Sequence, residues 1–212
     1  IGNYGQGDGL FIKPCGISIK GDVVYVADES THRIQMLKLD GQFLYKFGQR
    51  GSGIGQFECS RSVVIDSTRL IVSDFNNHRI QVFNLYGSWL STIDGNGSGE
   101  HCFMNPAGIA VDPQGNIHVV AKGSNAIKVF STQGTYVRSY GDLKGPVGIA
   151  IDDEGYCFVC EQEGDCLSIF DPQGSKIHTV GNLKKPYSVA LCPRDNSVYV
   201  AENGGIVFKY FM

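Results

Sequence analysis

The chain has 212 residues, of which 42% are hydrophobic and 18% charged. This composition is typical of a globular protein, and the formal net charge of −3 excludes a generally basic nucleic-acid-binding protein. No apolar run approaches the roughly 18 residues that cross a bilayer, so no membrane partner is predicted. The seven scattered cysteines, an odd number, favour a reducing compartment, and we expect a cytoplasmic location.

Three landmarks recur along the chain and define internal repeats. The first is a short apolar segment whose copies start 46, 46, 40 and 40 residues apart: PCGISI (14–19), SRSVVID (60–66), PAGIAVD (106–112), PVGIAID (146–152) and PYSVAL (186–191). In the first repeat, YVADESTHRIQML (25–37) and GQFLYKFG (41–48) are the other two. We predict a single domain, 1–212, with repeats at approximately 14–59, 60–105, 106–145, 146–185 and 186–212, and with 1–13 as the tail of a preceding repeat.

Each repeat is expected to contain four short strands, because runs of β-branched and aromatic residues alternate with Gly, Asp, Asn and Pro. In the first repeat the predicted strands are Gly16–Ile19, Val23–Ala27, Ile34–Leu39 and Gln42–Phe47. The apolar first strand is expected to be a buried inner strand. Four-stranded units of 40–46 residues are typical of propeller blades, so the predicted fold is all-β, a β-propeller with five recognisable blades.

The repeat motifs resemble the NHL repeat, most clearly NNHRIQVF at 76–83 and the pattern P-x-G-I-A-V-D at 106–112. The segment FGQRGSGIGQF (47–57) resembles the inter-blade linker of animal tripartite-motif (TRIM) NHL proteins, and VFKYFM (207–212) resembles the end of such chains. Those proteins are RING-type ubiquitin ligases or their relatives, with the propeller at the C-terminus. NHL propellers of this kind usually have six blades. The resemblance therefore implies an incomplete six-bladed propeller, with a five-bladed ring as the alternative.

Aspartate and arginine recur together at the start of the second landmark. Asp28 is followed by Arg33, and Asp74 by Arg79. In the third repeat both charges are replaced by alanine. Because an unpaired buried charge is costly, this joint loss predicts that each Asp and Arg form a structural ion pair.

Neither the histidines nor the cysteines predict a metal site. His32 and His78 occupy equivalent turns, and we interpret them as polar loop residues; the resemblance places the metal sites of NHL-type lyases in the central channel instead. Cys157 and Cys160 lie three apart in a predicted strand, where their side chains point to opposite faces. We predict two core cysteines, no metal, no cofactor and no catalytic residue.

One face of the propeller carries the longer and more varied loops. It is formed by the loops between second and third strands and by the inter-blade linkers, and we call it the loop face. Binding residues tend to lie in such loops. The candidate binding residues on the loop face are Lys13, His32, Arg50, Arg61, Phe75, Asn77, His78, Lys122, Asn125, Lys144, Lys184, Lys185 and Tyr187.

These observations predict a non-catalytic interaction scaffold. The resemblance implies the target-recognition domain of a TRIM-NHL-type ubiquitin ligase, which binds a protein partner such as a ubiquitination substrate. Ligase activity would reside in a RING domain outside this chain, so the chain itself is predicted not to be an enzyme. Sequence-selective binding of single-stranded RNA by the same face, for post-transcriptional regulation, is the alternative. A metal-dependent propeller lyase or hydrolase is a further alternative, for which the predicted inner strands offer few ligands.

Overall fold

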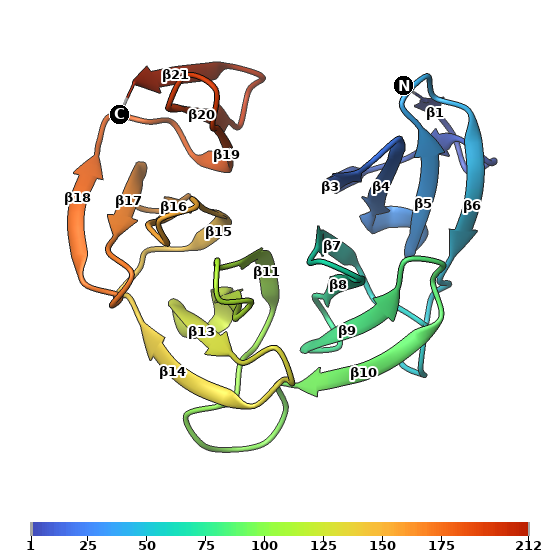
Figure 1. Cartoon of the computed structure of the whole chain (residues 1–212), viewed down its shortest axis with the longest axis horizontal. Helices are drawn as coiled ribbons and strands as arrows, with labels where there is room; N and C mark the ends of the chain where they lie inside the picture. The colour runs from blue at the N-terminus through green and yellow to red at the C-terminus, as the bar shows by residue number, and fades with distance from the viewer. Residues whose placement is uncertain (1, 212) are drawn as a thin grey trace. The chain divides into compact units, whose positions relative to one another are not determined.

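The chain folds into short antiparallel sheets joined by tight turns (Figure 1). The structure is a computed structural model that describes residues 2–211, and it confirms the predicted all-β propeller fold with five blades. The described residues contain no α-helix, and their two 3-10 helical turns are η1 (Glu29–Thr31) and η2 (Lys122–Ser124). No helical segment in the described part is long and apolar enough to cross a bilayer.

The chain divides into two compact units. Unit 1 contains the residues up to Ser98 together with Cys102–Pro106. A short parallel pair of strands, β1 (Asn3–Tyr4) and β2 (Leu10–Phe11), precedes its two blades. Blade 1 is the sheet β3 (Pro14–Lys20), β4 (Val23–Asp28), β5 (Arg33–Lys38), β6 (Phe43–Phe47). Blade 2 is the sheet β7 (Ser60–Ile65), β8 (Arg69–Asp74), β9 (Arg79–Asn84), β10 (Trp89–Asp94).

Unit 2 contains Gly99–His101 and the residues from Ala107 onward. Blade 3 is the sheet β11 (Pro106–Val111), β12 (Ile117–Ala121), β13 (Ala126–Phe130), β14 (Tyr136–Tyr140). Blade 4 is the sheet β15 (Pro146–Ile151), β16 (Cys157–Glu161), β17 (Cys166–Phe170), β18 (Lys176–Val180). In the described residues blade 5 has three strands, β19 (Pro186–Cys192), β20 (Ser197–Glu202), β21 (Val207–Phe211). The single-domain assignment stays a prediction.

Burial is deepest in the middle strands of each blade. All five residues of β12 and of β16 are buried. The expectation of a buried first strand is wrong for β3, which has no buried residue. Edge position alone is not the reason, because β7, β11, β15 and β19 are also edge strands of their sheets and each has buried residues. In β3 the position that packs against another blade elsewhere, Ile17, is 63% exposed. The core therefore lies around the second and third strands.

Buried polar side chains of each blade hold the linker that precedes it. In blade 2 the Asp74 carboxylate accepts the backbone N–H of Glu58 at 2.7 Å. Arg79 donates through Nη2 to the carbonyl of Gln56 at 2.9 Å, and Gln81 donates through Nε2 to the same carbonyl at 2.7 Å. Arg79 also forms an ion pair with Asp74, with 2.8 Å between Nε and Oδ2. We call these three side chains the linker clamp of blade 2.

Blade 1 has an equivalent clamp, in which Asp28 and Arg33 bond different groups of the preceding linker. Asp28 accepts the backbone N–H groups of Ile12 and Lys13 at 3.1 and 2.9 Å. The Arg33 guanidinium donates to linker carbonyls, namely those of Gln6, Gly7 and Leu10. Asp28 and Arg33 face each other in the strand register, but both bond the linker backbone rather than each other, and the buried Nε of Arg33 has no hydrogen-bond partner among the described residues. The repeated Asp and Arg thus fix the linker in both blades.

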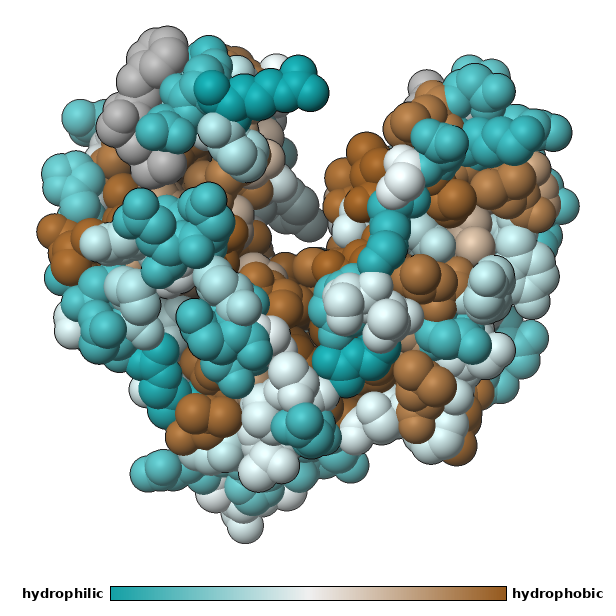
Figure 2. Space-filling view, in the orientation of Figure 1, coloured by the Kyte–Doolittle hydropathy of each residue, from teal (hydrophilic) through white to brown (hydrophobic). Residues whose placement is uncertain are grey.

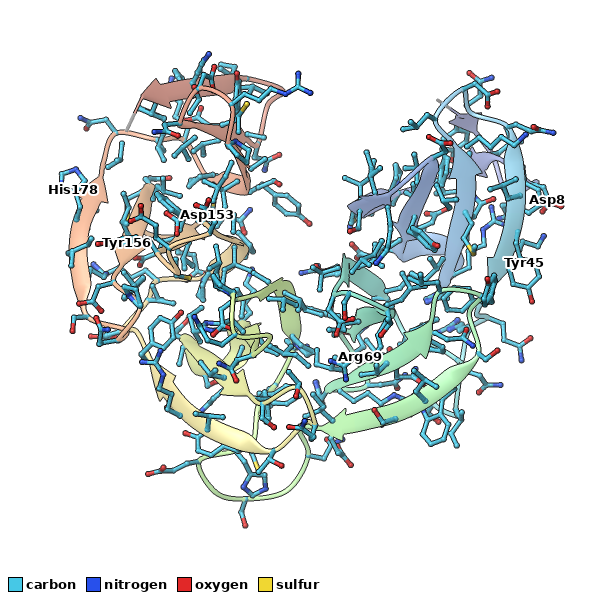
Figure 3. All side chains as sticks on the ribbon, viewed as in Figure 1. Asp8, Tyr45, Arg69, Asp153, Tyr156 and His178 are labelled. Atoms are coloured by element: carbon cyan, nitrogen blue, oxygen red, sulfur yellow. The ribbon has the colours of Figure 1, made fainter. Side chains whose placement is uncertain are left out.

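Tight turns close the face opposite to the loop face. Asp112, Asp152 and Asp171 each accept two backbone N–H groups of their own turn. This Asx geometry stabilises a turn without tertiary contacts. Figure 3 labels two more residues of such turns: Arg69, which pairs with Asp66 at 2.5 Å, and the exposed Asp153. The side chains of this face therefore serve mainly the turns themselves.

The first strand of blade 1 is exposed at a position that is buried in other blades. Ile17 is 63% exposed, whereas the equivalent residues in other first strands, Val63, Ile149 and Val189, are 3%, 9% and 8% exposed. Val63 belongs to a core cluster that includes Ala27 and Ile34 of blade 1, so this position normally packs against the preceding blade. Figure 2 shows apolar atoms at the surface where β3 lies in Figure 1.

This difference predicts unequal effects of the same truncation. Val63→Ala should lower the free energy of unfolding by about 2 kcal/mol, because it leaves a cavity between the blades. Ile17→Ala should change it by no more than about 0.5 kcal/mol, since its side chain is already in contact with water. Urea denaturation of both variants measures the difference. Equal losses would contradict the difference in exposure between Ile17 and Val63.

Candidate functional site

A group of charged and aromatic side chains lies on the loop face of unit 1, where blade 1 meets blade 2. Lys13 Nζ is 3.1 Å from Glu29 Oε1, and Arg61 Nε is 3.5 Å from Glu29 Oε2. The Cys15 thiol donates to the same Oε2 at 3.3 Å. The Arg61 guanidinium carbon lies 3.7 Å from the centroid of the Phe75 ring. We call these five residues the junction cluster; it unites three of the predicted candidates.

The strands and turns of two blades position the junction cluster. Lys13 directly precedes β3, Glu29 begins η1, Arg61 is the second residue of β7, and Phe75 directly follows β8. Each of Glu29 and Phe75 comes directly after the clamp aspartate of its blade. Sequence reasoning missed Glu29 because the residue type at this position changes from blade to blade, with Lys122 in blade 3. Glu29 could have been found because it occupies the same position in its repeat as Phe75, which was a predicted candidate.

The junction cluster has a charged carboxylate and a neutral thiol. Burial raises the pKa of Glu29, but the hydrogen bond from Lys13 and the charge of Arg61 outweigh it and hold that pKa below its usual value. For Cys15, burial and the neighbouring Glu29 carboxylate raise the pKa to about 11. A thiol nucleophile must first lose its proton. Cys15 is therefore a hydrogen-bond donor at neutral pH, and the cluster carries a net charge of +1 from two cations and one carboxylate.

Three predicted candidates join neighbouring blades through one equivalent turn position. The side chains of His32 and His78 accept the backbone N–H of Cys59 and Asn105 through Nδ1, at 3.0 and 3.1 Å. The Asn125 side chain accepts that of Gly145 at 3.4 Å.

Asp165 of blade 4 occupies the same position and accepts the N–H of Lys185 at 2.9 Å. All four acceptor residues have positive φ, between 49° and 55°, because the chain reverses there. The geometry gives this position a structural role.

The other candidates of unit 1 have partners close in sequence. Arg50 is 73% exposed in its side chain and pairs with Glu58 at 3.0 Å. The Asn77 amide donates to the carbonyl of Gly51 and to Asp74 Oδ2, both at 2.9 Å, and so belongs to the blade 2 clamp. Neither residue contributes a contact to the junction cluster.

The lysine candidates of unit 2 are separate from one another. Lys144 and Lys184 donate backbone N–H groups to the buried carboxylates of Glu161 and Glu202, at 2.6 and 2.5 Å. These acids repeat the clamp geometry of Asp28 and Asp74. Lys122 Nζ donates to Gln162 at 3.4 Å, and Tyr187 is 37% exposed on β19. The binding role of all thirteen candidates stays a prediction.

A second group of titratable side chains is buried between blades 3 and 4 of unit 2. His118 is 4% exposed; its Nε2 is 3.2 Å from Asp112 Oδ2 and its Nδ1 is 2.9 Å from the Tyr140 hydroxyl. Tyr140 in turn hydrogen-bonds Cys157. Burial raises the pKa of Tyr140 and raises that of Cys157 to about 12. Burial also lowers the pKa of His118, although Asp112 opposes this.

The lowered pKa of His118 predicts a loss of stability in mild acid. As pH falls below about 6.5, the unfolded chain takes up a proton at this histidine before the folded chain does. The free energy of unfolding should therefore fall with pH in the window between about 6.5 and the lower folded-state pKa. Thermal melts across that window measure it. His118→Phe should flatten the profile, whereas His101→Gln, at an exposed histidine, should leave it unchanged.

The described residues contain no group of three or more His, Cys, Asp or Glu side chains that could hold a metal ion. Cys157 and Cys160 are both buried, and burial raises each pKa to about 12.

The fold is that of a β-propeller, and comparison with known proteins identifies the propeller family. The profile of the DUF5128 family, 6-bladed beta-propellers, matches residues 57–210, so the chain belongs to this family. No curated protein is similar enough in sequence to count as a relative.

Solved structures share the fold at low sequence identity. A streptogramin B lyase is 14% identical, with a TM-score of 0.73 over 99% of this chain and 71% of that one. A gluconolactonase from Xanthomonas campestris is 12% identical, with a TM-score of 0.75 over 92% and 71%. A catalytically inactive virginiamycin B lyase from Staphylococcus aureus, with quinupristin, is 16% identical, with a TM-score of 0.69 over 94% and 70%.

These structures correct the prediction that the chain is not an enzyme. That prediction rests on the resemblance to TRIM-NHL proteins and on the few ligands that the predicted inner strands offer, yet propellers of the same fold are named as lyases and as a gluconolactonase. The fold is therefore compatible with catalysis as well as with binding. Which activity this chain has depends on its own side chains.

Proposed function

We propose that the chain recognises a protein partner through the loop face, with the junction cluster of unit 1 as the main contact. The observation that carries this proposal is the Arg61 guanidinium lying 3.7 Å above the Phe75 ring, beside Lys13. Arginine and aromatic side chains are enriched among the residues that dominate binding energies at protein interfaces. The NHL-like motifs support a place for the chain as target-recognition domain of a TRIM-NHL-type ubiquitin ligase, acting in the cytoplasm.

A selection from a displayed peptide library tests this proposal. Wild-type protein should enrich a defined set of peptides, and Phe75→Ala should abolish that enrichment because it removes the platform for Arg61. Asp153→Ala, on the opposite turn face, should retain it. Enrichment that survives Phe75→Ala but not Asp153→Ala would place the binding surface on the other face. RNA binding by the loop face would instead appear as a selected single-stranded motif that persists when the salt is raised from about 50 mM to about 200 mM, a change that weakens binding through phosphate contacts alone.

A lyase or hydrolase activity is the second candidate, and the named enzymes that share the fold support it. Purified protein should then open gluconolactone or a streptogramin B antibiotic faster than buffer does. Because the described side chains do not form a metal cluster, the assay is run with added divalent cations and with a chelator. No turnover under either condition would leave partner recognition as the sole candidate.

A further inference from the structure

The junction cluster has the features of a site for one carboxylate. We propose that Arg61, held on the ring of Phe75, binds an Asp or Glu side chain of an acidic peptide segment in the partner. This inference rests on the proposed function and specifies the chemistry of the ligand. It follows from the fixed position of the guanidinium, from its unused donors and from the charge around it.

Arg61 is held in place before any ligand arrives. It extends from β7, and its side chain is only 20% exposed. The backbone that carries the ring beneath it is fixed as well, because the N–H of Phe75 donates to the carbonyl of Cys59 at 3.1 Å, and the ring itself is half-buried. A side chain that is already ordered loses less conformational entropy on binding. The stacked arginine is therefore preorganised for recognition.

The terminal donors of Arg61 are unused. Its terminal Nη1 and Nη2 atoms make no hydrogen bond to the described residues. Within the Arg61 guanidinium, Nε is the nitrogen that is buried without a hydrogen-bond partner. Glu29 lies 3.5 Å from that Nε, too far for a good hydrogen bond, and its oxygens accept from Lys13 and Cys15 instead. Glu29 thus orients the guanidinium through charge and leaves its two terminal nitrogens for a ligand. A pair of parallel N–H groups matches the two oxygens of a carboxylate.

The surrounding charges favour a single carboxylate over a nucleic acid. The cluster carries a net charge of +1, and the nearby Arg50 is neutralised by Glu58 at 3.0 Å. A strand of RNA brings one negative charge per nucleotide past Glu29 and Glu58, and one face of the Phe75 ring is already covered by Arg61. Stacking of a base on that face would require the arginine to leave. A single carboxylate can bind Arg61 without displacing it from the ring and without bringing a row of negative charges past the two glutamates.

Fluorescence anisotropy with two pools of labelled nine-residue peptides tests the inference. One pool has a central Asp or Glu with random flanks, and the other has Asn or Gln at the same position. We expect the wild-type protein to bind the acidic pool at least about tenfold more tightly, the range that a charge-assisted bidentate pair provides. Arg61→Lys, which keeps the charge but removes the planar pair of donors, should abolish this preference. Arg69→Lys, at the arginine that pairs with Asp66 on the opposite turn face, should retain it.

The outcomes separate this inference from the proposed function. Equal binding of both pools, or a preference for acid that Arg61→Lys leaves intact, would overturn the carboxylate site while partner recognition stands. Binding of neither pool would overturn both. Binding of a random RNA pool that depends on Arg61 would also overturn the carboxylate site in favour of phosphate. Thermal melts of Arg61→Lys and Arg69→Lys check that both variants are folded.

Discussion

Replacement of Asp74 by alanine is expected to lower the free energy of unfolding by about 3–5 kcal/mol, because it leaves the Arg79 guanidinium without its counter-charge. Asp74 is fully buried and accepts hydrogen bonds from the backbone of Glu58 and from Arg79, Asn77 and Gln81. Its loss therefore removes the charge partner and the anchor of the linker together. Equilibrium denaturation in urea measures the change.

Two further variants make the Asp74 result specific. Asp153→Ala removes an exposed carboxylate from a turn and should change stability by no more than about 0.5 kcal/mol. In Asp74→Ala/Arg79→Met no buried charge is left alone, so the double variant should lose less than the sum of the two single losses. A strictly additive double variant would show that the pair is not coupled.

Phe57→Ala is the second change with a large expected effect, a loss of about 3–5 kcal/mol from a cavity in the core. Phe57 ends the linker before blade 2 and is fully buried. Its ring centroid lies 6.5 Å from that of Phe47 and 5.8 Å from that of Phe83. The side chain therefore fastens the linker to the core between the two blades, and urea denaturation should show the loss directly.

The same linker offers the control for this prediction. Ile54 is 65% exposed, so Ile54→Ala should change the free energy of unfolding by no more than about 0.5 kcal/mol. Phe57→Leu should cost less than Phe57→Ala, because Leu143 and Leu183 fill the equivalent place in unit 2 and are 2% and 3% exposed. A loss in Ile54→Ala as large as that in Phe57→Ala would contradict this role of the ring.

The sequence predicts the strands better than it predicts the contacts between them. The expected strands of the first repeat lie within about two residues of β3 to β6, because alternating runs and turn residues are local features. The ion pair of Asp74 and Arg79 could be predicted for the same reason, because the two residues are five positions apart in the sequence. Arg33, in contrast, donates to the linker backbone, which lies more than 20 positions away in the chain. Spacing within a motif does not show a partner of that kind.

The binding candidates show the same limit. Sequence reasoning placed Lys13, Arg61 and Phe75 on one face but had no means to show that they meet. Contact depends on how closely blade 1 packs against blade 2, which is a tertiary property. Glu29, which joins two of them, was missed because its position holds a different residue type in each blade. His32 and Asn125 accept backbone hydrogen bonds from the segment before the next blade, a contact that the sequence did not predict, and their binding role stays a prediction.

In blades 1, 2, 4 and 5 a clamp carboxylate fastens the segment directly before the blade, whereas blade 3 has Ala121 at this position. The clamp carboxylate lies 16 positions after its backbone partner in blade 2, 17 in blade 4 and 18 in blade 5. One stretch of chain therefore encodes both a linker and the residues that fasten it. Such a cassette can be duplicated in a gene without loss of fit, because each copy brings its own fastening. The clamps thus give a physical route by which propellers of this kind gain or lose whole blades during evolution.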